Sequence, residues 1–350
     1  MGRSNITAQE TTQSKKDWQR VVPGLVVSLI ALAVVLYFVD IRKFFTALHQ
    51  ANYFLIAAGL LLSLVWLFVR AAFWRTLLQG KATYSQTFLT ICEGYLLNNI
   101  LPFRLGEVGR SFLMSHKTKI SFWQVLSTIV IERVLDVGFA AGLLLITLPL
   151  VMNARGRGNV NVSTNMAISA GLLVLLGLVT LYILALNHQR ALAIFEKLAG
   201  RWPFLLRLGG NMIPAFFSGL EVLTNGQLFL SALGWMLLNW LVAIAEYYVL
   251  LMAFFPNGKL LWSAFTLAVA AFGVAVPSSP GSIGVLEGAF LVALATFGVD
   301  SSTALAYAIT AHLMGYLTNG LLGAFALGKD GESLTDLYSR VRQISVKQDH

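Results

Sequence analysis

The sequence is poor in charge. Only 12% of its 350 residues are Asp, Glu, Lys or Arg, whereas 57% are hydrophobic. Soluble proteins carry about twice that share of charged residues. Several apolar runs are long enough to cross a bilayer, which takes roughly 20 residues. The composition therefore excludes an ordinary soluble domain and predicts an all-α polytopic membrane protein.

The chain also lacks the residue patterns of the common metal, redox and catalytic sites. Its single cysteine, Cys92, excludes an intrachain disulfide and a CxxC metal motif. The sequence contains no GxSxG, HExxH or Walker pattern, and no dinucleotide-binding GxGxxG. The predicted spans leave no segment long enough for a soluble catalytic domain. We therefore expect no enzyme activity, no metal and no cofactor.

The net charge of +9 has a particular meaning in a chain that spans a membrane. In a membrane protein an excess of Lys and Arg reports topology and contact with anionic lipid. The basic residues are scattered among loops, and no nucleic-acid-binding motif accompanies them. The expected partners are membrane lipids, and nucleic acid is not expected to bind.

Six apolar runs predict full membrane spans: 21–39, 53–70, 121–151, 166–186, 228–254 and 302–328. Two further apolar segments, 84–101 and 260–276, run into stretches rich in proline and glycine. Such breaks at membrane depth are tolerated only where the backbone is buried in protein or lines a polar cavity. We therefore interpret both segments as re-entrant helical hairpins, which gives about eight membrane segments.

The distribution of basic residues favours this topology. With both hairpins re-entrant and the N-terminus cytoplasmic, 19 Lys and Arg residues, Arg70 among them, fall on the cytoplasmic side and five on the other. Any model in which one or both segments cross has a weaker bias. The two hairpins then enter from opposite sides, and in each a proline-glycine break is followed by a glutamate. This arrangement is typical of an inverted repeat in a transporter.

The predicted organisation has three parts. Residues 1–20 form a flexible cytoplasmic N-terminus, 21–328 a single transmembrane domain, and 329–350 a cytoplasmic tail. Residues 188–226 mix basic and aromatic side chains, which fits either surface amphipathic helices or an ordinary connector. The expected location is the inner (plasma) membrane.

Three polar clusters interrupt the apolar sequence: NNILPFRLGEVGR at 98–110, IERVLD at 131–136 and PSSPGSIGVLEG at 277–288. A charge near the bilayer centre costs roughly 2.5–3.5 kcal/mol, so these side chains should face one another or a wet cavity. Arg133 is three residues before Asp136 and is expected to pair with it, which leaves Glu132 free to reach Arg104 or Arg110. Glu246 and His312 flank the third cluster, and His312 is expected to be a buried, hydrogen-bonded histidine.

The guanidinium fork matches a phosphate group, and a broken helix leaves backbone N–H groups free to bind an anion. The residues predicted to bind substrate are Arg104, Arg110, Arg133, Asn99 and Glu107. The residues predicted to balance charge or couple to protons are Glu132, Asp136, Glu287 and Glu93. The residues predicted to shape the re-entrant backbone are Pro102, Gly106, Pro277, Pro280, Gly281 and Gly284. Two alternatives stay open: a purely structural ion network, and Asn98 or Asn99 acting as a cap of the broken helix.

Together the clusters resemble the flippase-like membrane domain of lysylphosphatidylglycerol synthases. That family's pattern is N-x-x-P-x-R-x-G-E-x-x-R, then E-R-x-x-D, then P-x-x-P-G-x-x-G-x-x-E. The matching blocks here run from Asn99 to Arg110, from Glu132 to Asp136 and from Pro277 to Glu287, and the resemblance covers nearly all of 20–328. The resemblance implies movement or handling of a lipid without its synthesis, because the soluble synthase domain is absent. It does not identify the lipid.

The leading hypothesis is a transporter that moves a lipid with a phosphate-bearing headgroup between leaflets. The alternative is a scaffold or regulator that binds lipid or a lipid-modifying enzyme without transport. A third hypothesis is an intramembrane enzyme that uses Glu93 and Glu107 as acid and base. The lipid, the coupling ion and the oligomeric state stay open.

Overall fold

The computed structural model describes residues 37, 39–101, 105–154, 212–275 and 279–331, together with scattered positions between 168 and 197. Every regular element in these ranges is a helix. The elements are α2 (Ile41–Gln50), α3 (Tyr53–Leu77), α4 (Tyr84–Ile100), α5 (Leu105–Lys117), α6 (Phe122–Ala154), α10 (Met212–Leu220), η2 (Glu221–Leu223), α11 (Gly226–Phe254), α12 (Leu260–Ala275), η3 (Pro280–Ser282), α13 (Val285–Ala295) and α14 (Ser301–Asp330).

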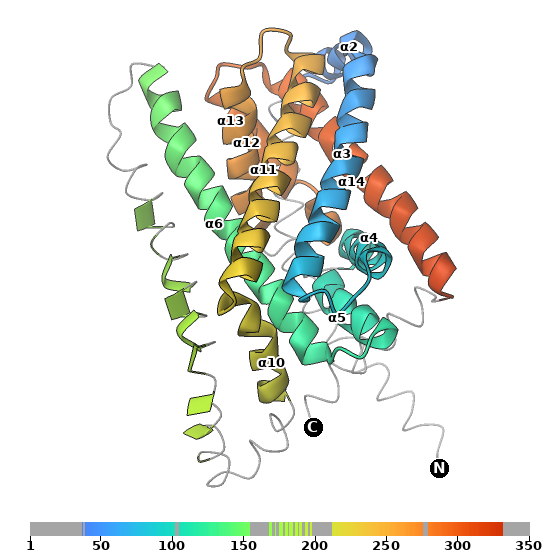
Figure 1. Ribbon diagram of the computed structural model, residues 1–350. Helices are drawn as coiled ribbons and strands as arrows, with labels where there is room; N and C mark the ends of the chain where they lie inside the picture. Colours follow the sequence, from blue (N-terminus) through green and yellow to red (C-terminus); the bar gives the residue numbers. More distant parts are fainter. Residues whose placement is uncertain are drawn as a thin grey trace, which may run out of the picture.

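Long helices form where four of the six spans are predicted, as α3, α6, α11 and α14 (Figure 1). In the described part of the chain, three stretches are long and apolar enough to cross a membrane: Tyr53–Leu77, Phe122–Met152 and Gly226–Phe254. Helix α14 is as long but carries more polar side chains. The predicted span 21–39 lies almost wholly outside the described residues, as do most of 188–211 and the tail after 331, and the predicted span 166–186 is described only at scattered positions.

Several helices begin at a side-chain cap, the long helices α3, α11 and α14 among them. Asn52, Asn225 and Asp300 each precede a helix and accept a hydrogen bond from a backbone N–H of its first turn. Such caps replace bonds that the first N–H groups cannot make inside the helix. They fix the starting residues of α3, α11 and α14, and so set which face each helix presents to the bundle.

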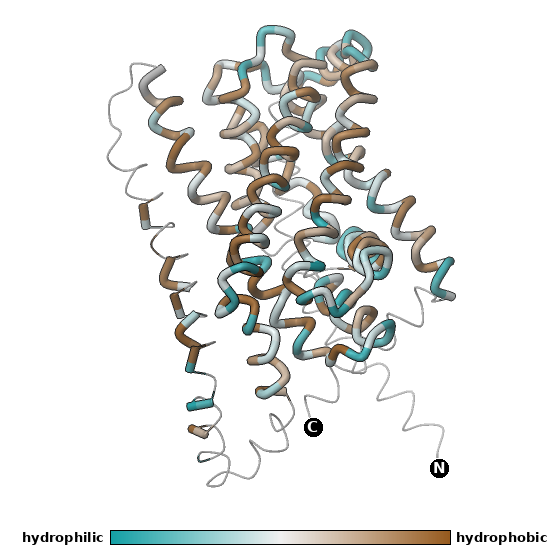
Figure 2. Tube along the Cα trace, viewed as in Figure 1, coloured by the Kyte–Doolittle hydropathy of each residue, from teal (hydrophilic) through white to brown (hydrophobic). Residues whose placement is uncertain are grey.

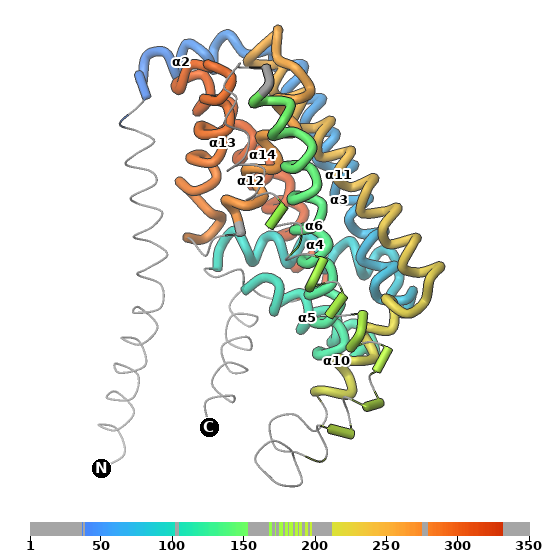
Figure 3. The backbone as a smooth tube through the Cα atoms, turned by 90° about the vertical axis from the view of Figure 1, so that its left-hand side faces the viewer, coloured from blue at the N-terminus to red at the C-terminus, as the bar shows by residue number. Residues whose placement is uncertain are grey.

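Two helical hairpins lie between the long helices. Helix α4 packs against α5, and α12 packs against α13. In both Figure 1 and Figure 3 the α4–α5 hairpin occupies one half of the bundle, and the α12–α13 hairpin lies toward the other end, near α2. The turn η3 of the second hairpin packs against α4 of the first. The second predicted break therefore lies against the helix that leads into the first.

Helix α2 was not predicted. It begins after Asp40, which caps it, and the Asp40 backbone N–H donates to Ser302 Oγ at the start of α14 over 3.0 Å. The helix lies across the end of the bundle in Figure 3. Figure 2 shows hydrophobic residues along the long helices and hydrophilic residues gathered at the two ends and around α4 and α5.

Glycine permits the close approach of α4 and α5. A Cβ placed on Gly106 would lie 2.5 Å from Asn98 Oδ1 and would collide with the Gly94 carbonyl oxygen. A Cβ on Gly94 would collide with the Arg110 side chain. The predicted role of Gly106 in shaping the first hairpin therefore has a steric basis.

We predict that Gly106→Ala lowers the free energy of unfolding by about 1–3 kcal/mol, the usual cost of overpacking a close contact. The measurement is denaturant or thermal unfolding of the purified protein in detergent. Gly142→Ala in α6 is the matched control, because nothing lies within 4 Å of its added Cβ. The control should be neutral or stabilise by about 0.5–1 kcal/mol. Equal stabilities for the two variants would contradict the close approach.

Candidate functional site

Three arginines from three helices converge on one buried carboxylate. Glu132 Oε1 accepts from Arg70 Nη2 at 2.8 Å, from Arg110 Nη1 at 2.9 Å and from Arg133 Nη2 at 2.6 Å. Its second oxygen accepts from Arg110 Nη2 at 3.0 Å. The Glu132 side chain is 0% exposed. This contact joins α3, α5 and α6. It confirms Arg110, one of the two arginines predicted to reach Glu132, and it shows that Arg133 binds Glu132 as well as Asp136.

Asp136 and Glu107 complete this group, which we call the arginine cluster. Asp136 accepts from Arg70 at 2.9 and 2.5 Å, and its Oδ2 lies 3.3 Å from Arg133 Nη2. Arg133 Nε lies 3.6 Å from Glu107 Oε1, which is the longest of the pairs. The cluster consists of Arg70, Arg110, Arg133, Glu107, Glu132 and Asp136. Its three positive and three negative formal charges cancel.

Arg70 is the member that the sequence prediction missed. It was counted with the cytoplasmic loop charges because it stands near the end of an apolar run. In the structure it lies within α3, is 2% exposed and pairs with two carboxylates of α6. Its guanidinium also lies 5.4 Å from the Phe73 ring and 5.8 Å from the Trp66 ring. An arginine inside a span, rather than beside it, was the signal available in the sequence.

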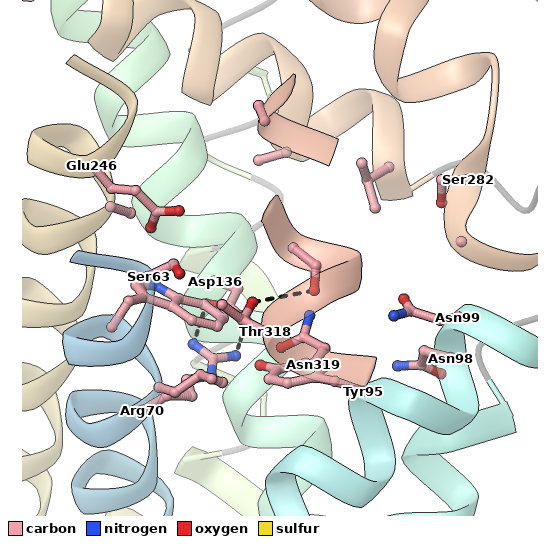
Figure 4. A pocket seen from close by; sticks show the side chains of 18 of the residues that line it. Ser63, Arg70, Tyr95, Asn98, Asn99, Asp136, Glu246, Ser282, Thr318 and Asn319 are labelled. Atoms are coloured by element: carbon pink, nitrogen blue, oxygen red, sulfur yellow. Dashed lines mark hydrogen bonds and ion pairs between the residues drawn. The ribbon is translucent and has the colours of Figure 1, made fainter. Parts of the chain in front are cut away.

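The cluster forms one wall of a cavity of about 500 Å³ in the middle of the bundle (Figure 4). Its lining comes from α3, α4, α5, α6, α11, α12, η3 and α14. The charged lining residues are Arg70, Arg133, Glu107, Asp136 and Glu246, and the amide residues are Asn98, Asn99, Asn239 and Asn319. Serines and apolar side chains complete the lining.

Arg110 does not line this cavity. Its side chain is 1% exposed, both terminal nitrogens bind Glu132, and its guanidinium carbon lies 4.1 Å from the centre of the Trp74 ring. Arg133, in contrast, is 31% exposed and faces the cavity. Of the arginines predicted to bind substrate and described in the structure, Arg133 is therefore the one placed to touch a ligand.

The first break is held by an asparagine. Asn98 Oδ1 accepts from the Gly106 backbone N–H at 2.9 Å, so the last turns of α4 satisfy the start of α5. This confirms the alternative in which Asn98 acts as a cap. Asn99 lines the cavity, and its Nδ2 is buried without a hydrogen-bond partner among the described residues. Pro102 and Arg104 lie in 102–104, outside the described residues.

A second ion group lies apart from the arginine cluster. Lys117 Nζ lies 2.6 Å from Glu93 Oε2 and also pairs with Asp330 at the end of α14. It bonds Thr90 Oγ1 as well, at 3.2 Å. Glu93 is 0% exposed. This group ties α4, α5 and α14 together, and it places Glu93 and Glu107 in separate ion groups.

The second break is held by a glutamate and a histidine. Glu287 Oε2 accepts from the Gly284 backbone N–H at 2.7 Å, and Glu287 Oε1 lies 2.5 Å from His312 Nδ1. Gly281 and Gly284 have φ of 65° and 84°, a region that favours glycine, so their predicted backbone role has a conformational basis. Pro280 begins η3, and Pro277 lies outside the described residues.

We predict that Glu132→Gln destabilises the protein by about 3–5 kcal/mol, because removing one partner leaves buried charge uncompensated. The measurement is the free energy of unfolding in detergent. Glu221→Gln is the control, since Glu221 is exposed and its side chain belongs to no ion pair in the part of the chain that the structure describes. A Glu132→Gln protein as stable as the control would contradict a central role for the cluster.

Comparison with known proteins agrees with the three motifs. The chain is 26% identical over 324 residues to the glycosyltransferase AglD of Haloferax volcanii, covering 83% of this chain but 51% of that protein, so it spans about half the length of that relative. It is 26% identical over 239 residues to a UPF0104 membrane protein of Methanocaldococcus jannaschii, with 65% and 91% coverage. It is 22% identical over 334 residues to another of Methanothermobacter thermautotrophicus, with 91% and 96% coverage.

No solved structure matches the chain. The family model described as the lysylphosphatidylglycerol synthase TM region matches residues 21–323. That match covers most of the chain, including all three motifs and every residue that lines the cavity. The protein is therefore a membrane protein of the lysylphosphatidylglycerol synthase TM region family.

Proposed function

We propose that the protein moves a lipid between membrane leaflets, and that the lipid headgroup passes through the cavity bounded by the arginine cluster. The observation that carries this proposal is a cavity whose lining includes five charged and four amide side chains, between helices that expose many large apolar side chains on their outer surface. A lipid needs such a path for its headgroup alone, because its acyl tails stay in the bilayer. A phosphate-bearing headgroup fits Arg133, the more exposed of the two arginines that line the cavity.

The two hairpins act in this proposal as re-entrant segments that enter from opposite sides. Their helices have 17, 13, 16 and 11 residues, fewer than the roughly 20 that a span needs. Their breaks meet at the cavity through the contact of η3 with α4. This geometry supports an inverted repeat, in which each hairpin in turn opens the cavity to one side.

The charges of the cluster suggest how a phosphate is bound. Within the cluster as defined the six formal charges cancel, so an arriving anion competes with the carboxylates for an arginine. The contact between Arg133 and Glu107 is the longest of the cluster, at 3.6 Å, and both side chains are partly exposed. Arg133 therefore binds the phosphate, and Glu107 is the partner that it releases.

The remaining members of the cluster position Arg133. Arg70 and Arg110 hold Glu132 in place. Glu132 and Asp136 in turn contact Nη2 of Arg133 and fix the orientation of its guanidinium. The amides that line the cavity bind the hydroxyl or phosphate oxygens of the headgroup. The buried Asn99 Nδ2 and Asn239 Oδ1 atoms, without partners among the described residues, are suited to this. The prediction that Arg104 binds phosphate stays a prediction.

A second candidate function follows from one comparison. The relative named as a glycosyltransferase matches this chain over about half its length. In this reading the cavity holds a lipid-linked substrate for a separate enzyme, and no lipid crosses the membrane. Lipid binding without transport, and copurification with a glycosyltransferase or another lipid-modifying enzyme, would favour it.

We predict that the reconstituted protein moves at least one headgroup-labelled lipid, and that Arg133→Gln lowers the rate at least about tenfold, the effect of losing one charge-assisted hydrogen bond. The assay uses proteoliposomes with a labelled anionic phospholipid, an aminoacylated phospholipid or a polyprenyl phosphate. It measures the label accessible outside over time, with and without a proton gradient.

Lys119→Gln is the control, because Lys119 is exposed and the substitution removes the same charge. It should leave the rate unchanged, and circular dichroism should show that both variants are folded. Full activity of Arg133→Gln would remove Arg133 from the headgroup site. A folded wild-type protein that moves none of the three lipids would favour the scaffold.

A further inference from the structure

The second break is fastened to α14 through one imidazole ring. His312 Nε2 lies 2.8 Å from the Gly281 carbonyl oxygen, and His312 Nδ1 lies 2.5 Å from Glu287 Oε1. The other oxygen of Glu287 accepts from the Gly284 backbone N–H. Both ring nitrogens and both carboxyl oxygens are therefore in use. The protons present at these four atoms decide whether every contact is a hydrogen bond.

The contacts of His312 and Glu287 require one particular number of protons on the pair. A carbonyl oxygen only accepts, so Nε2 must carry a proton to bond Gly281. A second proton must then lie between Nδ1 and Glu287 Oε1. It belongs either to an imidazolium facing a carboxylate or to a carboxylic acid facing a neutral ring. In both forms Glu287 Oε2 stays free to accept from Gly284, so the contacts require one shared proton and no more.

Removing the shared proton breaks one contact. A neutral ring has a single N–H, and a carboxylate accepts more strongly than a peptide carbonyl. The N–H therefore turns to Glu287, and the lone pair of Nε2 then faces the Gly281 oxygen. Two acceptors 2.8 Å apart repel each other, so the Gly281 end of the break is the part that is released.

The released segment is part of the cavity wall. Ser279, Gly281 and Ser282 line the cavity, and η3 packs against α4. Tyr316 lies so close to Gly281 that a Cβ there would collide with its hydroxyl. Movement of Gly281 away from His312 therefore displaces a part of the cavity wall that packs against α4.

We propose that His312 and Glu287 form a proton-binding site that latches the 280–284 break to α14, so that loss of the shared proton opens this wall of the cavity. The proposal deepens the transport function. Its role in coupling rests on that function, whereas the latch itself is tested without transport. The sequence alone indicated Glu287 as one of four coupling carboxylates and gave His312 no such role.

Few other titratable groups face this site. Tyr316 packs at a tilt against His312, with ring centres 4.8 Å apart. Across the cavity lie Glu246 of α11, Tyr95 of α4 and Arg70 of α3, and Arg70 is held by Asp136. Helix α12, which packs against α13, carries no titratable side chain. The shared proton is thus the titratable proton in direct contact with the break.

The test measures access to Ser282 with a cysteine in its place. The full chain carries Cys92→Ala, which removes the only native cysteine, and Ser282→Cys, and it is studied in detergent so that all surfaces meet the same pH. The rate of maleimide labelling is divided by that of Ser121→Cys, an exposed position. We expect the ratio to rise on the order of tenfold from acidic to alkaline pH, as the shared proton is lost.

Two variants give opposite results if the latch exists. Glu287→Gln supplies an amide N–H to Nδ1 and an amide oxygen to Gly284 without a titratable proton, so labelling should be slow and independent of pH. His312→Gln cannot bridge both partners, so labelling should be fast and independent of pH. Circular dichroism and gel filtration check that each variant is folded.

A ratio that stays flat in the parent, or a Glu287→Gln protein that responds to pH like the parent, overturns the latch. If the latch behaves as expected but transport proceeds equally well at all pH values and gradients, the site is a proton switch without a coupling role. If no lipid moves at all, the proposed function fails while the labelling result stands.

Discussion

The structure depends on the way Glu132 is shared among three arginines. A carboxylate without water is costly unless it is paired and hydrogen-bonded. Here four hydrogen bonds reach Glu132, from α3, α5 and α6, and its side chain is 0% exposed. Its pairing allows an apolar bundle to hold three arginines in its interior. It also brings the first hairpin against two long helices, and so sets the shape of the cavity.

The same need to pair buried polar groups applies at the two breaks. An interrupted helix leaves backbone groups that lipid cannot satisfy. At the first break Asn98 accepts from Gly106, and at the second Glu287 accepts from Gly284 while His312 binds the Gly281 carbonyl oxygen. The first break uses a side chain that does not titrate. The second uses a pair whose contacts depend on one proton. This difference makes the second break the one that the proposed latch releases.

Much of this arrangement could be predicted from the sequence. Polar residues inside apolar runs must pair with one another or face a cavity, because buried charge is costly. This cost and the residue spacing predicted the two broken hairpins. They also predicted that Glu132 reaches Arg104 or Arg110 and that Asp136 pairs with Arg133. Four of the six predicted spans are long helices, although α14 is more polar than the other three. The family match confirms the resemblance that the motifs carried.

The rest required three dimensions. Arg70 was counted with the loops because it stands at the end of an apolar run. Hydropathy alone does not show whether such a residue lies inside the bundle or just beyond it. The bond from Lys117 to Asp330 joins residues far apart in the chain, and no spacing rule predicts it. Helix α2 was missed although its amphipathic pattern and the Asp40 cap before it were present in the sequence. The orientation of Arg110 away from the cavity depends on where Glu132 stands, which only packing decides.

The most direct test of the central claim, that two opposed hairpins meet at an internal polar cavity, is a cross-link between them. With Cys92 replaced by alanine, Asn99→Cys in α4 and Ser282→Cys in η3 are paired in native membranes and treated with a short bifunctional thiol reagent. Both side chains line the cavity (Figure 4), and η3 packs against α4. The account predicts an intramolecular cross-link for this pair and none for Ser121→Cys with Ser282→Cys. Failure of the first pair, with both single cysteines reactive, would contradict it.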